Sequence, residues 1–171
     1  MQKIEVFFDH TCPYCHRGLG YLWEFLPSFK DIDIVWCPVE AHPKNEEPAH
    51  RPWQNLAVQA SLCVRDLGAD EETFHKRLFK AYFEEKQSVE DIAVLAKCAE
   101  EIGADRAKVE SALKEAKFEN EQLKANDYAY EEKEVWAVPT YVGETERLAA
   151  IGGIGVTKAQ VKKLLENCST K

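Results

Sequence analysis

The stretch Phe8-Asp9-His10-Thr11-Cys12-Pro13-Tyr14-Cys15 decides which fold this chain is expected to adopt. It follows an apolar run, Ile4 to Phe8, that predicts a buried strand, and it opens a segment, Pro13 to Leu26, that predicts a helix. Two cysteines three residues apart at a helix start share one face, so their sulfurs can close a disulfide or remain as reactive thiols. Unpaired backbone N–H groups at the helix start favour the Cys12 thiolate, and Pro13 suits the first helical position. The stretch therefore predicts redox chemistry.

Two other interpretations of the cysteine pair remain open. His10 and His16 flank the pair, which gives four candidate zinc ligands within seven residues. Zinc sites usually draw two pairs of ligands from separate segments, however, and the sequence has no second Cys-x-x-Cys. A purely structural disulfide is the other alternative, although so short a loop gains little from a cross-link. The strand-to-helix context favours the redox pair.

Composition limits the class of protein. A chain of 171 residues with 45% hydrophobic residues is long enough for one domain with an insertion. A net charge of -8 argues against a nucleic acid or an anionic membrane surface as the main partner. Four further cysteines, Cys37, Cys63, Cys98 and Cys168, are widely spaced, which suits a reducing compartment. Because we find no leader segment and no membrane-length apolar run, we expect a cytoplasmic location.

A second strand is predicted at Ile32 to Val39, where β-branched and aromatic residues gather. The strand-helix-strand order predicts that it pairs in parallel with the first strand. Because parallel strands end at the same edge of a sheet, Cys37 is expected toward the Cys12 side, although a free cysteine is more often an inert apolar residue.

The region from Trp53 to about Glu134 carries apolar residues at helical spacing and almost no strand signal. Candidate N-cap residues and glycine stops divide it into several helices. The last and longest of these helices is expected to run through Phe118, Leu123 and Tyr130. Helices that follow helices in this way indicate a compact helical insertion.

The C-terminal part predicts a return to the sheet. Val138 to Val142 and Arg147 to Ile151 are two short strands joined by a glycine-containing turn, which predicts a hairpin. A final helix is expected after Thr157, which forms a capping box with Gln160. Pro139 cannot donate to a sheet ladder and marks an edge, a bulge or a special turn. Taken alone, Pro139 predicts a trans bond, because about 5–6% of X-Pro bonds in folded proteins are cis.

The order strand, Cys-Pro-Tyr-Cys, helix, strand, helical block, Val-Pro-Thr, hairpin and helix resembles the DsbA-like branch of the thioredoxin superfamily, and most of all its cytoplasmic FrnE-type members. The motifs at residues 8–18 and 136–142 carry the resemblance. It implies an α/β, thioredoxin-like fold with an inserted α-helical domain. We divide the chain accordingly into a thioredoxin-fold N-terminal part at 1–52, a helical insertion at 53–117 and a thioredoxin-fold C-terminal part at 118–171.

The resemblance also implies roles for individual residues. Cys12 would be the attacking thiol, Cys15 the resolving thiol and Pro139 a cis-proline beside them. The chain departs from the family pattern at Val6, where many members carry an acid that helps to move a proton. Glutathione-using relatives of the kappa transferase kind typically have serine in place of Cys12, so two cysteines favour dithiol chemistry.

We therefore predict a thiol–disulfide oxidoreductase acting through Cys12 and Cys15 on protein or small-molecule disulfides. Pro13, Tyr14, Val138 and Pro139 are the predicted substrate-contacting residues, and His10 and His16 are candidates for tuning the site by positive charge. The prediction needs no cofactor and no metal, and it allows glutathione as a co-substrate. Two alternatives stay open: a kappa-type glutathione-dependent transferase or isomerase, and a metal-binding protein using the two cysteines. The sequence leaves the redox direction, the recycling partner and the oligomeric state undetermined.

Overall fold

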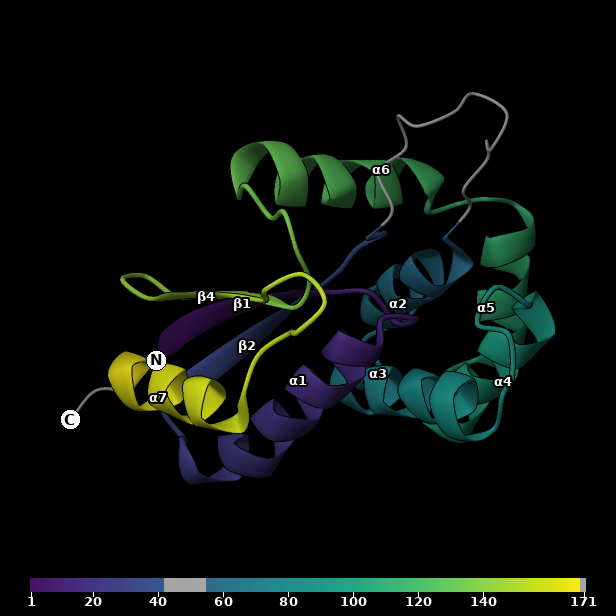
Figure 1. The fold of residues 1–171 in the computed structure, drawn as a ribbon. Helices are drawn as coiled ribbons and strands as arrows, with labels where there is room; N and C mark the ends of the chain where they lie inside the picture. Colours follow the sequence, from purple (N-terminus) through teal and green to yellow (C-terminus); the bar gives the residue numbers. More distant parts are fainter. Residues whose placement is uncertain (42–54, 170–171) are drawn as a thin grey trace. The chain divides into compact units, whose positions relative to one another are not determined.

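The structure is a computed structural model that describes residues 1–41 and 55–169 (Figure 1). The chain divides into two compact units, one formed by Met1–Ala41 with Ala129–Lys171 and the other by His42–Tyr128. The helical insertion expected at 53–117 falls within the second unit. The boundary expected between residues 52 and 53 lies outside the described residues.

The first unit is built on a four-stranded sheet in the order β2-β1-β3-β4. Its strands are β1 (Gln2–Phe8), β2 (Ile32–Pro38), β3 (Thr140–Val142) and β4 (Arg147–Ala149). β1 pairs in parallel with β2 and antiparallel with β3, and β4 pairs antiparallel with β3. The predicted parallel pair and the predicted hairpin are both confirmed. The last strand is shorter than expected, because Ile151 forms an isolated bridge with Gly155 instead of extending β4.

Two helices pack together on one side of this sheet (Figure 1). Helix α1 (Pro13–Phe25) continues into a 3-10 turn at Leu26–Ser28, and α7 (Lys158–Cys168) follows the hairpin. The capping box predicted at the start of α7 is confirmed: the Thr157 N–H donates to Gln160 Oε1 at 2.8 Å, and the Gln160 N–H donates to Thr157 Oγ1 at 3.2 Å. These contacts satisfy backbone donors at the helix start.

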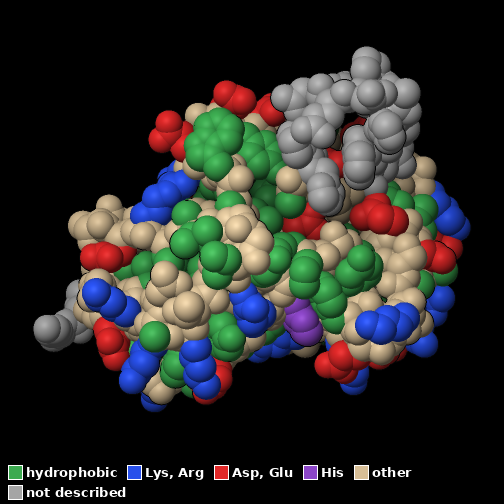
Figure 2. Space-filling view, in the orientation of Figure 1, with side chains coloured by type: hydrophobic (Ala, Val, Ile, Leu, Met, Phe, Trp, Pro, Cys, Tyr) green, Lys and Arg blue, Asp and Glu red, His purple; other side chains and the backbone are tan. Residues whose placement is uncertain are grey.

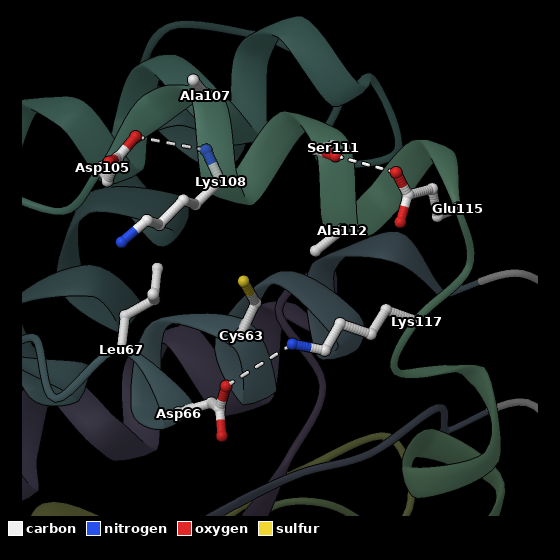
Figure 3. A pocket seen from close by; sticks show the side chains of 10 residues that line it. All are labelled: Cys63, Asp66, Leu67, Asp105, Ala107, Lys108, Ser111, Ala112, Glu115 and Lys117. Atoms are coloured by element: carbon white, nitrogen blue, oxygen red, sulfur yellow. Dashed lines mark hydrogen bonds and ion pairs between the residues drawn. The ribbon is translucent and has the colours of Figure 1, made fainter.

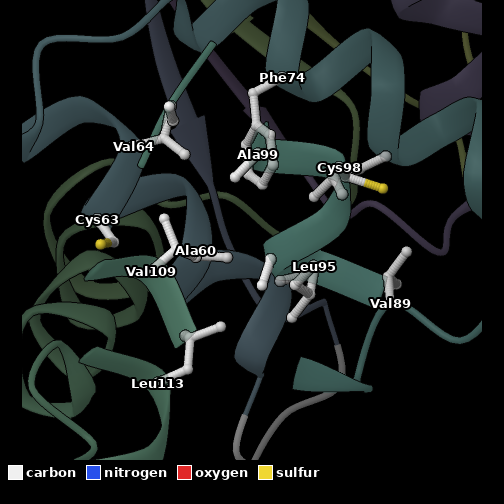
Figure 4. Packing of buried hydrophobic residues seen from close by; sticks show 14 of the residues in the cluster. Ala60, Cys63, Val64, Phe74, Val89, Leu95, Cys98, Ala99, Val109 and Leu113 are labelled. Carbon is white, nitrogen blue, oxygen red and sulfur yellow. The ribbon is translucent and has the colours of Figure 1, made fainter. Parts of the chain in front are cut away.

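The second unit consists of helices in its described part. They are α2 (Leu56–Asp66), α3 (Glu71–Phe79), α4 (Ile92–Glu101), α5 (Arg106–Lys114) and α6 (Glu119–Asp127), with a π-helical turn at Lys80–Glu84. A second π-helical turn, Tyr128–Glu132, follows α6 and leads into the first unit. Figure 4 shows their packed apolar side chains, among which Phe74, Leu95 and Val109 are fully buried. The expected helical insertion therefore has a core of its own.

The last helix of this unit, α6, has polar side chains on its buried face. α6 buries Gln122 and Asn126, whereas Leu123 is 36% exposed. The buried amide of Gln122 accepts a hydrogen bond from the side chain of Gln59 at 2.9 Å. This hydrogen bond joins two buried polar side chains, so helical periodicity of apolar residues could not reveal which face of α6 is inward.

The surface carries both signs of charge. Figure 2 shows one face, on which Lys and Arg side chains are interspersed with Asp and Glu. No helix within residues 1–41 and 55–169 is long and apolar enough to cross a membrane.

Candidate active site

Cys12 is the N-cap residue of α1, directly after the turn that leaves β1. Its extended backbone, with φ of -83° and ψ of 119°, turns its sulfur toward the first turn of the helix, where the Cys15 N–H donates to Cys12 Sγ at 3.4 Å. Pro13 occupies the start of the helix, where it removes no needed donor. The predicted strand, turn and helix therefore place the Cys12 sulfur at a helix N-terminus.

This position lowers the pKa of Cys12 to about 7. The largest cause is its hydrogen bond with the Cys15 side chain. That bond and the backbone N–H groups of Cys15 and Tyr14 together outweigh partial burial and the charge of Asp9, which both raise the pKa. A substantial fraction of Cys12 is therefore thiolate near neutral pH, and the thiolate is the nucleophilic form.

Cys15 has the opposite properties. Its side chain is fully buried, and burial, followed by the hydrogen bond and the charge of Cys12, raises its pKa well above the usual value. Both cysteines are free thiols in the structure. The pair therefore combines a half-buried sulfur that ionises readily with an enclosed sulfur that stays protonated.

The second half of the site comes from the segment before β3. The Cys12 sulfur lies 3.9 Å from the carbonyl oxygen of Val138, which is 126 positions away in the sequence. The Val138–Pro139 peptide bond is cis, which is the isomer that the family resemblance implies and not the trans isomer that Pro139 taken alone predicts. The structure thus brings the two predicted motifs together at the Cys12 sulfur.

The close approach of these segments depends on a glycine in α1. A methyl group at Gly18 would lie 2.9 Å from Pro139 Cγ and 2.8 Å from the Tyr141 hydroxyl oxygen. Real side chains almost never come so close, so a larger residue at this position would force the helix away from the Pro139 segment.

Tyr14 lies against a turn that follows β4. A methyl group at Gly155 would lie 3.1 Å from Tyr14 Cβ, and the φ of Gly155 is +80°. The Arg17 guanidinium lies 5.6 Å from the centre of the Tyr14 ring and donates a hydrogen bond to the carbonyl oxygen of Ile154. Beside this turn, Ile151 and Ile154 are exposed apolar side chains.

Asp9 is a residue of the site that the sequence analysis did not assign. Its buried carboxylate accepts hydrogen bonds from the Thr11 N–H at 2.8 Å, the Thr11 hydroxyl at 2.7 Å and the Ala41 N–H at 2.9 Å. It thereby ties the turn before Cys12 to the segment after β2. Its charge also raises the pKa of both cysteines. The signal in the sequence is an acid three positions before Cys12, whereas the family pattern has its acid six positions before that cysteine, where this chain has Val6.

The two histidines lie in different environments. The His10 ring is buried and packs edge-to-face with the Phe8 ring, at 5.2 Å between ring centres, and His16 is half-buried in the first turn of α1. Cys37 sits opposite Phe7 in the parallel pair, and its thiol lies 3.6 Å from the carbonyl oxygen of Val35. The expected tuning by His10 and His16 stays a prediction.

A pocket in the helical unit contains a different cysteine. It has a volume of about 380 Å³, and the Cys63 sulfur points into it beside Lys117 and Ala112 (Figure 3). Burial raises the pKa of Cys63, although the charge of Lys117 acts in the opposite direction. Cys63 is therefore a poorer nucleophile than Cys12 at neutral pH.

The described residues also bear on the metal-binding alternative. Across residues 1–41 and 55–169, no three side chains of the types His, Cys, Asp and Glu are grouped so that they could hold a metal ion. His10 and His16 thus do not complete a ligand set with the two cysteines in this conformation.

Residues 3–160 match the family described as DSBA-like thioredoxin domain. The chain is also 31% identical over 182 residues to the uncharacterized protein YwbO of Bacillus subtilis (strain 168), an alignment that covers 87% of this chain and 90% of YwbO.

Solved structures share the same fold. One is a probable DsbA oxidoreductase from Streptomyces coelicolor, with a TM-score of 0.79 and 13% identity, covering 98% of this chain and 90% of that chain. Another is MdbA, a thiol-disulfide oxidoreductase from Actinomyces oris, with a TM-score of 0.70 and 18% identity, covering 99% of this chain and 82% of that chain. At such identities the likeness is one of fold.

Proposed function

Because the chain belongs to the DSBA-like thioredoxin domain family, we propose that Cys12 and Cys15 are the redox pair of a thiol–disulfide oxidoreductase. The expected fold, an α/β thioredoxin-like fold with an inserted helical domain, is confirmed by the mixed sheet and the described helices. Family membership supports the general activity, and the roles of individual residues rest on the geometry of the site.

One observation carries the assignment of roles: the two cysteines differ in the direction in which their pKa is shifted. The pKa of Cys12 is lowered to about 7, whereas the pKa of the buried Cys15 is raised. A nucleophile must be ionised and accessible, while a resolving thiol is held in reserve until the first bond has formed. The geometry therefore supports Cys12 as the attacking thiol and Cys15 as the resolving thiol.

The proposed reaction has two exchange steps. The Cys12 thiolate attacks one sulfur of a substrate disulfide, which forms a mixed disulfide and releases the other sulfur as a thiolate. Cys15 then loses its proton and attacks the Cys12 sulfur, which forms the Cys12–Cys15 disulfide and releases the second substrate thiol. The substrate is reduced by two electrons and the enzyme is oxidised by two. The same steps in reverse oxidise a dithiol.

The substrate is proposed to be held beside Cys12 by the backbone of Val138. The Val138 carbonyl oxygen lies 3.9 Å from Cys12 Sγ and is therefore within reach of a peptide joined to that sulfur. Pro13 and Tyr14 form the neighbouring surface, with Pro13 exposed. We further propose that the protein works in the cytoplasm and that glutathione serves as a co-substrate.

The roles of the cysteines can be tested with serine variants. We expect Cys12→Ser to abolish reduction of insulin disulfides, because no nucleophile remains for the first step. Cys15→Ser should instead accumulate the mixed disulfide at Cys12, detected by mass spectrometry without reductant. Cys63→Ser is the matched control and should retain activity, since Cys63 lies in the helical unit. Full dithiol activity in the Cys12→Ser protein would rule out the proposed nucleophile.

A further inference from the structure

The side chain of Tyr141 carries a buried hydroxyl group that packing of its ring does not require. Its side chain is fully buried on β3, between Val6 of β1 and Leu148 of β4 in the sheet register. Among the described residues, 1–41 and 55–169, the hydroxyl has no hydrogen-bond partner. A buried hydroxyl without a partner costs free energy, whereas phenylalanine would fill the same space without that cost.

The hydroxyl lies on the Cys15 side of α1. A methyl group on Gly18 would lie 2.8 Å from the Tyr141 oxygen, and Gly18 is three residues after Cys15, on the same face of the helix. Burial raises the pKa of Tyr141 well above its usual value, and the charge of a Cys15 thiolate raises it further. Tyr141 therefore stays protonated at neutral pH and remains a hydrogen-bond donor.

Cys15 needs such a donor at one stage of the proposed reaction. Its sulfur is fully enclosed, so an anion there loses the hydration that would stabilise it in water. Asp9 opposes that anion as well, because its charge raises the pKa of Cys15. A buried O–H group within reach of the Cys15 sulfur would lower the free energy of the Cys15 thiolate.

We propose that the Tyr141 hydroxyl donates a hydrogen bond to the Cys15 thiolate while the mixed disulfide is resolved. The inference rests on the proposed function. In this step the Cys15 proton passes to solvent, the Cys15 sulfur forms a bond to the Cys12 sulfur, and the bond from Cys12 to the substrate sulfur breaks. The departing substrate thiolate takes a proton from solvent, so protons and electrons balance. Tyr141 keeps its own proton throughout.

Tyr141→Phe tests the proposal by removing a single oxygen atom. The mixed disulfide is formed at Cys12 with a small aromatic disulfide, and its decay is followed by release of the thiol. We expect decay in the variant to be about tenfold slower at pH 7, because a hydrogen bond to a charged group is at stake. The rate of forming the mixed disulfide should not change. Tyr21→Phe, a half-exposed tyrosine of α1, is the matched control and should resolve at the normal rate.

A pH profile and an unfolding measurement separate this role from a structural one. The rate at which Tyr141→Phe resolves the mixed disulfide should rise with pH, as in the original protein, but the rise should occur at higher pH. The reason is that the pKa of Cys15 increases when the donor is lost. Its midpoint in urea should equal or exceed that of the original protein, since an unpartnered buried hydroxyl has been removed. If Tyr141→Phe resolves the mixed disulfide at the original rate from pH 6 to 9, the proposal is overturned. It is also overturned if the variant resolves more slowly and its urea midpoint is lower, because lost stability then explains the slower rate.

A second measurement needs no variant and remains available if Tyr141→Phe does not fold. The ¹³Cζ resonance of Tyr141 in the reduced, labelled protein should shift as Cys15 ionises at high pH, and the absence of any shift at that transition would contradict the hydrogen bond. Failure of the proposed function can be told from failure of this inference. If the protein has no dithiol activity, the proposed function is wrong. If the protein is active and Tyr141→Phe resolves the mixed disulfide at the normal rate, only this inference is wrong.

Discussion

At the scale of single residues, Cys12 and Cys15 show how position along one helix turn separates two chemically identical groups. Cys12 accepts N–H donors at the helix start, and the pKa of its thiol falls to about 7. Cys15 points into the interior, and burial raises the pKa of its thiol. The difference in pKa arises from the direction of each side chain, because both residues lie at the same helix terminus.

The pKa of Cys12 predicts the pH dependence of its reactivity. We expect the rate of alkylation by iodoacetamide at Cys12 to rise with pH through about 7 and to level off above it, since only the thiolate reacts. An ordinary cysteine would show this rise near pH 8.5. The measurement is peptide mapping by mass spectrometry after timed alkylation, and a rise centred near 8.5 would contradict the effect of the helix start.

The pH dependence of Cys12 alkylation can also be measured in the variant Asp9→Asn. Asp9 holds a negative charge that raises the pKa of Cys12, so its neutral replacement should lower that pKa by less than about one unit. Asp91→Asn is the matched control, because Asp91 caps α4 in the helical unit. An upward shift in Asp9→Asn would show that its hydrogen bonds to Thr11, and not its charge, dominate at Cys12.

At the scale of elements, two glycines in α1 have opposite surroundings. Gly18 faces Pro139 and Tyr141 closely, whereas a methyl group at Gly20 would meet nothing within 4 Å. The sequence does not distinguish these two glycines, because both lie in the same predicted helix. They differ only in the residues that the rest of the fold places beside them.

This contrast predicts opposite effects of the same substitution. Gly20→Ala should stabilise the protein by up to about 1 kcal/mol through better helix propensity. Gly18→Ala should destabilise it by about 1–3 kcal/mol, because the added methyl group overpacks the contact with Pro139. Urea unfolding monitored by circular dichroism measures both changes. Equal stabilisation by the two substitutions would show that α1 does not pack closely against the Pro139 segment.

At the scale of the whole molecule, the chain forms two units, and each has buried residues of its own. The groups that set the pKa of Cys12, namely Cys15, Tyr14 and Asp9, all belong to the sheet-containing unit. The helical unit has an apolar core and the buried amide pair of Gln59 and Gln122.

This division predicts that stability and thiol chemistry can be changed separately. Gln122→Ala should lower the free energy of unfolding by about 1–3 kcal/mol, because the buried Gln59 amide loses its acceptor. The pH midpoint of Cys12 alkylation should stay where it is. Leu123→Ala, on the exposed side of the same helix, is the control and should change stability little. A shifted midpoint in folded Gln122→Ala protein would contradict the separation.

Features that depend on neighbours along the chain could be predicted from the sequence. These are the strand before Cys12, the helix start at Pro13, the capping box at Thr157 and the helical character of the insertion, because hydrophobic period and cap chemistry act over a few residues. The contacts between groups far apart in the sequence became visible in the folded chain. The fold placed the Val138 carbonyl near Cys12, 126 positions away, and a buried Tyr141 hydroxyl on the Cys15 side of α1. Such contacts depend on the packing of sheet and helix, which leaves no periodic signal in the sequence.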